Sequence, residues 1–201
     1  MDLVIVRHSI SVSNHADLIS GASNDVPLSD KGIAYAQQVA DAYDWGRFDA
    51  VYASPMVRAR QTAAILTNDR SDVQYDARLQ EMDFGDWDGT SAEPIRVEHP
   101  DAFDYAGMFN ANFSKYAPNA ESYDDLLHRA GSFLDDIKKA HPKDAVLVVC
   151  HGLTTRALFA DATGSDIYGF TAVKNVTLSE MHLDHKDDFR ARILRFNEQL
   201  A

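Results

Sequence analysis

The sequence predicts an α/β fold, a three-layer α/β/α sandwich built around a mainly parallel central sheet. Short apolar runs rich in β-branched residues recur along the chain, at residues 3–6, 50–53 and 145–149. Segments with helical periodicity separate these runs, and strands that alternate with helices are typical of parallel sheets. The 201 residues are enough for one domain with a sizeable core, so we predict a single domain over residues 1–201.

Each of the three runs has the length of a strand. Their apolar residues are continuous and polar residues bound them, which indicates strands buried on both faces of a sheet. A fourth run, at residues 176–183, alternates apolar and polar side chains more regularly. We therefore expect this fourth strand at an edge of the sheet.

Helices are expected between the strands. Ser29 or Asp30 is a suitable cap for a helix over residues 31–43. Further helical patterns lie at residues 56–67, at residues 121–140 with Glu121 and Ser122 near the start, and at residues 154–160. The alternation of strands and helices predicts right-handed crossovers.

The segment from about residue 90 to residue 119 interrupts this alternation. It is rich in aromatic residues and has no clean period. We expect an inserted segment that lies over the sheet in the manner of a lid. An irregular stretch whose aromatic side chains merely complete the core is an equally good interpretation.

Composition excludes several classes of partner. The net charge is −12, whereas general binding to nucleic acid or anionic membranes needs a surplus of Lys and Arg. Cys150 is the only cysteine, which excludes an internal disulfide and a Cys-based zinc site. No apolar stretch reaches the length of a membrane span and no signal-peptide pattern is present, so we expect a cytoplasmic location.

Chemically active residues follow the predicted strands. Arg7 and His8 follow the first strand, Arg58 comes shortly after the second, and His151 follows the third. Ligand sites in open α/β sheets form at the carboxyl ends of the strands. Two His and two Arg gathered there would be costly to bury without an anion, so the sequence predicts a phosphate site.

The motifs around these residues resemble those of the histidine phosphatase superfamily, also called phosphoglycerate mutase-like. Six motifs in the family's order carry the resemblance: residues 7–14 (RHSISVSN), 20–21 (SG), 27–32 (PLSDKG), 54–63 (SPMVRARQTA), 79–89 (LQEMDFGDWDG) and 148–152 (VVCHG) with Arg156. They extend over nearly the whole chain. The resemblance implies the fold predicted above and a phosphoryl-transfer enzyme that needs no metal or other cofactor.

The resemblance also implies roles for individual residues. His8 would attack phosphorus as a neutral imidazole and form a phosphohistidine. Arg7, Arg58 and a protonated His151 would surround the phosphoryl oxygens, and Glu81 would act as general acid and base. The rest of the phosphate cradle would come from side chains and backbone amides at Asn14, Ser9, Ser20, Gly21 and Gly152.

The chain departs from the family's pattern at Ser9, where the family has Gly. The added side chain either donates a hydrogen bond or narrows the pocket, so a non-catalytic module that binds a phosphorylated ligand stays open as an alternative. A metallohydrolase is a third interpretation, which activity after chelation would exclude.

Within the family, a phosphatase acting on a small phosphate ester fits better than a mutase. Residues 90–119 hold only Arg96 and Lys115 as cations for a second charged group of the substrate. The sequence leaves the oligomeric state open.

Overall fold

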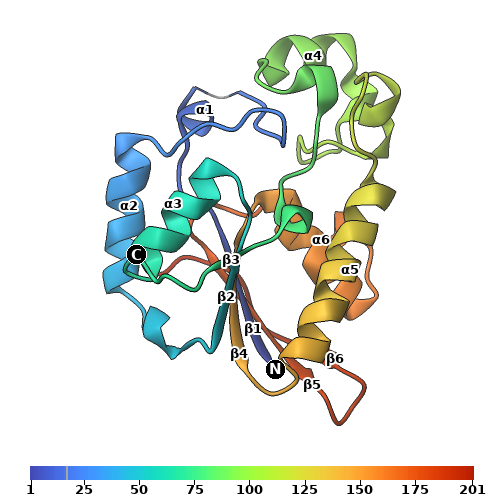
Figure 1. Cartoon of the computed structure of the whole chain (residues 1–201). Coiled ribbons are helices and arrows are strands. Elements are labelled where there is room, and N and C mark those ends of the chain that lie inside the picture. The colour runs from blue at the N-terminus through green and yellow to red at the C-terminus, as the bar shows by residue number, and fades with distance from the viewer. Residues whose placement is uncertain (17) are drawn as a thin grey trace.

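The computed structural model describes residues 1–16 and 18–201. A six-stranded sheet with the order β3-β2-β4-β1-β5-β6 forms its centre, as Figure 1 shows. β3, β2, β4 and β1 pair with one another in parallel, whereas β5 pairs antiparallel with both β1 and β6. The strands are β1 (Asp2–Arg7), β2 (Ala50–Ala53), β3 (Gln74–Tyr75), β4 (Ala145–Cys150), β5 (Leu178–Asp184) and β6 (Arg190–Glu198). The predicted α/β fold and mainly parallel sheet are confirmed.

Helices cover both faces of the sheet and complete the three layers (Figure 1). One face carries α2 (Asp30–Asp41) and α3 (Val57–Leu66), and the other carries α5 (Tyr123–Ala140) and α6 (Gly152–Thr163). Two short helices, α1 (Val12–His15) and α4 (Ala92–Glu98), lie beyond the carboxyl ends of the parallel strands (Figure 1).

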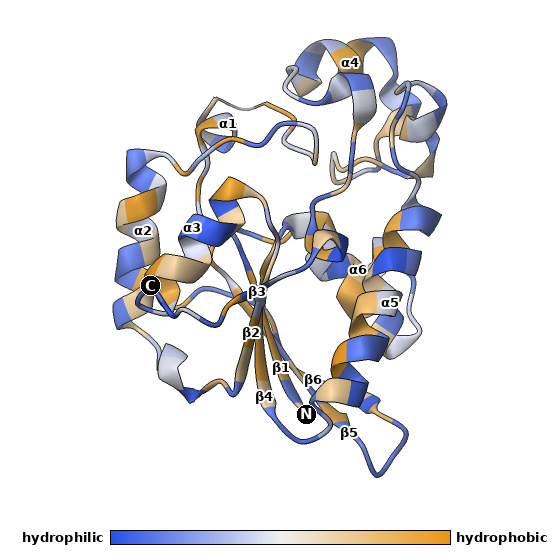
Figure 2. Cartoon of the chain, in the orientation of Figure 1, coloured by the Kyte–Doolittle hydropathy of each residue, from blue (hydrophilic) through white to orange (hydrophobic). Residues whose placement is uncertain are grey.

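The apolar runs explain the two cores. Side chains alternate across a strand, so Leu3 and Ile5 of β1 belong to the core on the α5 and α6 side. Val4 and Val6 belong to the core on the α2 and α3 side. All four are fully buried, and in Figure 2 the central strands are correspondingly orange, the hydrophobic colour.

The helix starts are close to those predicted. Ser29, not Asp30, caps α2, because its hydroxyl accepts a hydrogen bond from the Gly32 amide at 3.1 Å. Ser122 caps α5 in a capping box with Asp125. α6 begins at Gly152, two residues before the predicted start, because His151 is already its N-cap.

The expected edge position of the fourth strand is wrong. β5 lies between β1 and β6, and β6 is the edge strand. The sequence of β6, RARILRFNE, mixes charged and apolar residues, and most of its side chains are intermediate or exposed. Such a pattern gives little strand signal, as is common for an edge strand protected by charges.

Residues 90–119 form α4 and several turns above the carboxyl end of the sheet (Figure 1). Phe113 is fully buried in the core on the α5 side, and Phe103, Phe109 and Tyr116 pack against that core. Tyr105 is fully exposed. The segment therefore contributes most of its aromatic side chains to the core, while its backbone lies beyond the carboxyl ends of the parallel strands (Figure 1).

Candidate active site

The topology brings the two predicted His residues together. β1 and β4 are parallel neighbours with Arg7 opposite Cys150, so the residues after them emerge side by side. The His8 amide donates a hydrogen bond to the Cys150 carbonyl at 2.8 Å. The rings of His8 and His151 lie with their centroids 5.0 Å apart.

His8 has the properties of a nucleophile. Its Nδ1 lies 2.6 Å from the Ser9 carbonyl oxygen, which can only accept, so Nδ1 carries the proton and Nε2 keeps its lone pair. Burial lowers the pKa of the His8 imidazole well below its ordinary value, and the charges of Arg7 and Arg58 lower it further. His8 is therefore neutral near pH 7, as predicted.

His151 differs from the expectation that it is protonated. Burial lowers its pKa well below the ordinary value, and His8, Arg58 and Arg7 add to the effect. Its Nε2 lies 2.8 Å from the Ser54 hydroxyl, which itself accepts from the Met56 amide. The Ser54 hydroxyl has no other acceptor in the described part of the chain, so it is suited to donate to Nε2, which places the proton of a neutral ring on Nδ1, a buried atom with no described partner. Neutral His151 can donate one hydrogen bond from there.

The two arginines are held by backbone carbonyls. Arg58 is fully buried and donates to the carbonyls of Asn24, Ser20 and Gly21 at 3.0, 3.4 and 3.0 Å. Arg7 donates to the carbonyl of Val173. Carbonyls neutralise neither charge, so both guanidinium groups remain available to an anion.

Unpaired donors concentrate at this site. In residues 1–16 and 18–201, six buried side-chain polar atoms have no hydrogen-bond partner: Arg7 Nε, Ser20 Oγ, Tyr35 Oη, Arg58 Nε, His151 Nδ1 and Arg156 Nε. Four of the six belong to residues predicted for the phosphate site. Buried polar atoms in folded proteins are nearly always paired, so such a concentration indicates a missing ligand with several acceptors.

Glu81 lies at the N-terminus of α6. Its Oε1 accepts from the Thr154 amide and its Oε2 from the Leu153 amide, both at 3.3 Å. The Thr154 hydroxyl lies 3.3 Å from Oε1 and also donates to the Gln80 carbonyl at 2.7 Å. Glu81 is 7% exposed. Both carboxylate oxygens are thereby fixed at the wall of a cavity.

Gly152 lies beside this carboxylate. A Cβ at Gly152 would lie 3.6 Å from Arg7 Nε and 3.7 Å from Glu81 Oε2, so a larger residue there would enter the space between them. The amides of the two following residues already donate to Glu81. The predicted contribution of Gly152 to a phosphate cradle therefore concerns its own amide and not the two that follow it.

Of the two alternatives for Ser9, the structure shows the donated hydrogen bond, and Ser9 does not line the cavity described below. Ser9 is fully buried and its hydroxyl donates to the Gly32 carbonyl at 2.7 Å, while its amide donates to Thr62 Oγ1 at 2.9 Å. The side chain is thus directed to α2 and does not narrow the pocket. Gly32 makes this possible, because a Cβ there would lie only 2.0 Å from the Ile10 carbonyl oxygen.

The predicted phosphate contact by the Gly21 amide is wrong. That amide donates to Asp88 Oδ1, and the Ser23 amide donates to Asp88 Oδ2 at 2.9 Å. A Cβ on Gly21 would lie 2.5 Å from both Asp88 Oδ1 and the Met82 carbonyl oxygen. Gly21 instead supports the site through its carbonyl, which accepts from Arg58.

Asn14 lies close to the His8 backbone, to which Asn175 links it. Its Oδ1 accepts from the Ser11 amide at 3.3 Å and lies 3.5 Å from Asn175 Nδ2. Asn175 Nδ2 also donates to the His8 carbonyl at 2.9 Å. The carboxamide oxygen is thus occupied, and the amide nitrogen of Asn14 is the end suited to an anion.

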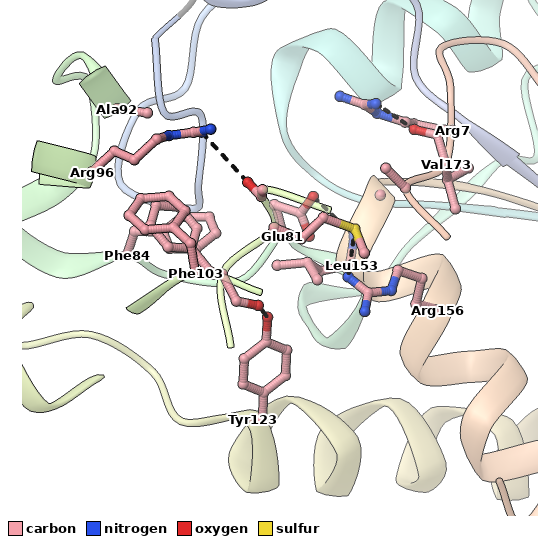
Figure 3. A pocket seen from close by; sticks show the side chains of 15 residues that line it. Arg7, Glu81, Phe84, Ala92, Arg96, Phe103, Tyr123, Leu153, Arg156 and Val173 are labelled. Atoms are coloured by element: carbon pink, nitrogen blue, oxygen red, sulfur yellow. Dashed lines mark hydrogen bonds between the residues drawn. The ribbon is translucent and has the colours of Figure 1, made fainter. Parts of the chain in front are cut away.

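A cavity of about 240 Å³ lies next to these residues, and Figure 3 shows the side chains that line it. Arg7, Glu81 and Gly152 line one part, and Phe84, Phe103, Met108, Phe109 and Tyr123 line much of the rest. Arg96 and Arg156 reach it from opposite sides (Figure 3). Arg96 is exposed, whereas Arg156 is 2% exposed.

Sequence reasoning missed two supporting residues. Asn175 precedes β5, and only the antiparallel direction of β5 brings it to the carboxyl end of β1. Arg129 of α5 donates to the carbonyls of Arg78, Gln80 and Glu81 at 2.6, 2.7 and 3.2 Å and also binds the Glu121 carboxylate. The sequence did contain a signal for Arg129: Glu121, near the predicted start of this helix, lies about two turns before Arg129 and is its ion-pair partner.

Two features are absent from the described part of the chain. None of its helices is long and apolar enough to cross a membrane. Within residues 1–16 and 18–201 there is also no group of three or more His, Cys, Asp or Glu that could hold a metal ion.

Known proteins resemble the chain over nearly its full length. It is 27% identical to phosphoserine phosphatase 1 of Hydrogenobacter thermophilus over 198 residues, 97% of this chain and 91% of that protein. It is 30% identical to the adenosylcobalamin/alpha-ribazole phosphatase of Escherichia coli over 165 residues, 82% and 80% of the two chains. The structure of YhfR from Bacillus stearothermophilus matches with a TM-score of 0.83 and 25% identity, over 98% of this chain and 97% of that one. The family model for the histidine phosphatase superfamily (branch 1) matches residues 3–199, and the chain therefore belongs to that superfamily.

Proposed function

We propose that this protein hydrolyses small-molecule phosphomonoesters through a phosphohistidine on His8. One observation carries the proposal. The unpaired donors of Arg7, Arg58 and His151 are buried around a neutral imidazole whose Nε2 is free. A phosphoryl group offers several acceptor oxygens to these donors and an electrophilic phosphorus to Nε2.

The reaction has two steps. The cycle begins with neutral His8 and with Glu81 as the neutral acid. His8 Nε2 forms a bond to phosphorus while the ester P–O bond breaks, and Glu81 gives its proton to the leaving oxygen and becomes a carboxylate. Water then attacks phosphorus as Glu81 takes a proton from it, and the P–N bond breaks. Inorganic phosphate leaves, and His8 and Glu81 return to their starting states.

Hydrolysis suits the cavity better than mutase chemistry. A mutase must hold a second strongly charged group of its substrate, whereas beyond Arg7 and Glu81 this cavity has only Arg96 and Arg156 as cations in a lining that is otherwise mainly aromatic and apolar. Both relatives described above by their activity are phosphatases. Their named substrates differ, so the comparison supports the type of reaction but does not identify the leaving group. The leaving group has to be inferred from the cavity of this chain.

The structure removes the reason for the alternative of a non-catalytic module that binds a phosphorylated ligand. It depended on Ser9, whose side chain is directed to α2 and leaves the pocket unchanged. We propose further that the protein acts in the cytoplasm on small molecules rather than on nucleic acid or membranes. Its net charge of −12 and its single, buried, free Cys150 support this setting.

The test is a burst experiment with 4-nitrophenyl phosphate in the presence of a chelator. We compare wild type with His8→Ala and with His128→Ala, a control that removes an exposed His on α5. Wild type and the control should turn over and form an acid-labile, base-stable phosphoenzyme that His8→Ala lacks. Activity that chelation abolishes would support a metallohydrolase, and stoichiometric binding without turnover would support a binding module.

A further inference from the structure

The cavity extends from the phosphoryl site along one face of α6. Gly152, Leu153 and Arg156 line it, and Gly152 lies against Arg7 and Glu81. Four residues of an α-helix span about 6 Å, so Arg156 lies about that far along the helix from the reacting end. A leaving group that occupies the cavity therefore passes over Arg156.

The walls along this path are mostly apolar. Phe84, Phe103 and Phe109 form an aromatic group whose ring centroids are 4.7–5.1 Å apart in neighbouring pairs. The Tyr123 hydroxyl donates to the Phe109 carbonyl at 2.6 Å, so its proton is already engaged within the wall (Figure 3). Such walls favour a leaving group with an apolar, preferably flat body.

Arg156 is the exception in these walls. It is 2% exposed, and its Nη2 donates to the Ile167 carbonyl at 3.0 Å. Its Nε has no partner in the described part of the chain. No described carboxylate forms an ion pair with it, although most other Arg side chains have one. A buried cation without an anion is costly, which indicates that the anion comes from outside the chain.

Met108 covers the remaining end of this guanidinium group. Its sulfur lies 3.7 Å from Arg156 Nη1, and a thioether is only a weak acceptor. The side chain is unbranched and flexible. It follows Gly107, whose φ of +77° suits glycine. An anionic oxygen that displaced the sulfur would give Nη1 a much stronger partner.

We propose that Arg156 and Met108 form a recognition site for a carboxylate on the leaving group. The substrate class is then a phosphomonoester whose leaving group joins an apolar body to a carboxylate that reaches Arg156, about one helical turn along α6 from Gly152. This inference rests on the proposed function. Arg96 makes a smaller contribution, since it is exposed and stacks on Phe103 with its guanidinium 4.8 Å from the ring centroid.

The test compares two substrates of similar reactivity. They are 3-carboxyphenyl phosphate and the neutral 3-(hydroxymethyl)phenyl phosphate, and inorganic phosphate release measures kcat/KM for each. The ratio of the two values is determined for wild type, Arg156→Met and the control Arg192→Met. Arg192 is exposed on β6, opposite His182 and near the start of β1, so the control removes the same charge at the far end of the sheet.

Wild type and Arg192→Met should prefer the carboxylated substrate, and Arg156→Met should reduce the ratio about tenfold to a hundredfold. Met108→Ala should increase the ratio, because it uncovers the guanidinium group while Arg156 stays in place. This second variant tests the inference even where Arg156→Met fails to fold.

Equal ratios in wild type, Arg156→Met and Met108→Ala would overturn the inference while hydrolysis itself upholds the proposed function. Hydrolysis of neither substrate would instead overturn the proposed function. Binding of 3-hydroxybenzoate, followed by ligand-observed NMR, then tests the carboxylate site separately. Signals that respond to wild type and not to Arg156→Met would support it, and equal responses would refute it.

Discussion

Removing the Arg129 side chain should impair catalysis by Glu81, although Arg129 does not line the cavity. Arg129 instead supports residues 78–81, the loop that carries Glu81. Its guanidinium group donates to three carbonyls at residues 78–81 and to both oxygens of Glu121. Arg129→Met breaks all these bonds and leaves the Glu121 carboxylate, 15% exposed, without its partner. Loss of one member of a buried ion pair costs about 3–5 kcal/mol, and the partial exposure here suggests the lower end, roughly 3 kcal/mol.

The loop that carries Glu81 then loses its support. A misplacement of about 1 Å in a catalytic group typically costs about 10²-fold in rate. The loss should fall mainly on substrates whose leaving oxygen needs a proton. We therefore expect kcat to fall about 10²-fold for an alkyl phosphate and much less for 4-nitrophenyl phosphate, whose leaving group departs as a stable anion.

The assay measures kcat for both substrates and the thermal midpoint of wild type, Arg129→Met and Arg78→Met. Arg78 forms a comparable network with Asp76 and Asp136 but its side chain does not bind the carbonyls of the loop. Arg78→Met should lose stability without selective loss on the alkyl phosphate. Equal losses on the two substrates in folded Arg129→Met, or a loss of stability alone, would refute the positioning role.

Three further outcomes follow from the site. Because the pKa of His8 lies well below its ordinary value, protonation of His8 should reduce kcat/KM only at pH values below about 6.5, as a pH–rate profile measures. The free energy of unfolding should depend on pH in the same direction. As pH falls, His8 binds its proton first in the unfolded chain, so the stability that neutral His8 contributes is present above about pH 6.5 and is lost toward the folded pKa. Unfolding measured as a function of acid pH would detect this loss. Ser9→Ala should cost about 1 kcal/mol of stability, since it removes the 2.7 Å hydrogen bond to the Gly32 carbonyl, and kcat should change little. A large change in kcat without a loss of stability would instead indicate that Ser9 contacts the substrate. Gly21→Ala should cost about 1–3 kcal/mol in chemical denaturation, because its Cβ would lie 2.5 Å from Asp88 Oδ1. It should also lower kcat, because the crowding would move the loop whose carbonyls bind Arg58. Unchanged stability would contradict the crowding.

Much of the fold was predictable because its signals are local. Apolar runs buried on both faces give β1, β2 and β4 directly, and Ser29 and Ser122 mark helix starts by their own hydrogen bonds. β6 was not predictable in this way. Its position depends on pairing with β5 at a sheet edge, and its mixed residues carry little periodic signal.

At the site, residue positions were more predictable than residue tasks. The ends of the parallel strands indicate where His8 and His151 lie, because neighbouring parallel strands end at one edge. They do not indicate which donors are already engaged. The Gly21 amide and the Ser9 hydroxyl have partners 67 and 23 residues away in sequence, and only the folded chain brings those partners within reach.

The separate origins of the two halves of the cavity have a consequence for how such an enzyme acquires new substrates. The reacting nitrogen of His8 extends directly from a central strand that is bonded on both sides to its neighbours. Much of the wall against the leaving group, from Ala92 to Phe109, lies on helix and turns outside the sheet. Exchange of that one continuous stretch can therefore reset selectivity while the phosphoryl-transfer machinery keeps its geometry, which makes residues 90–119 the natural region for library-based redesign.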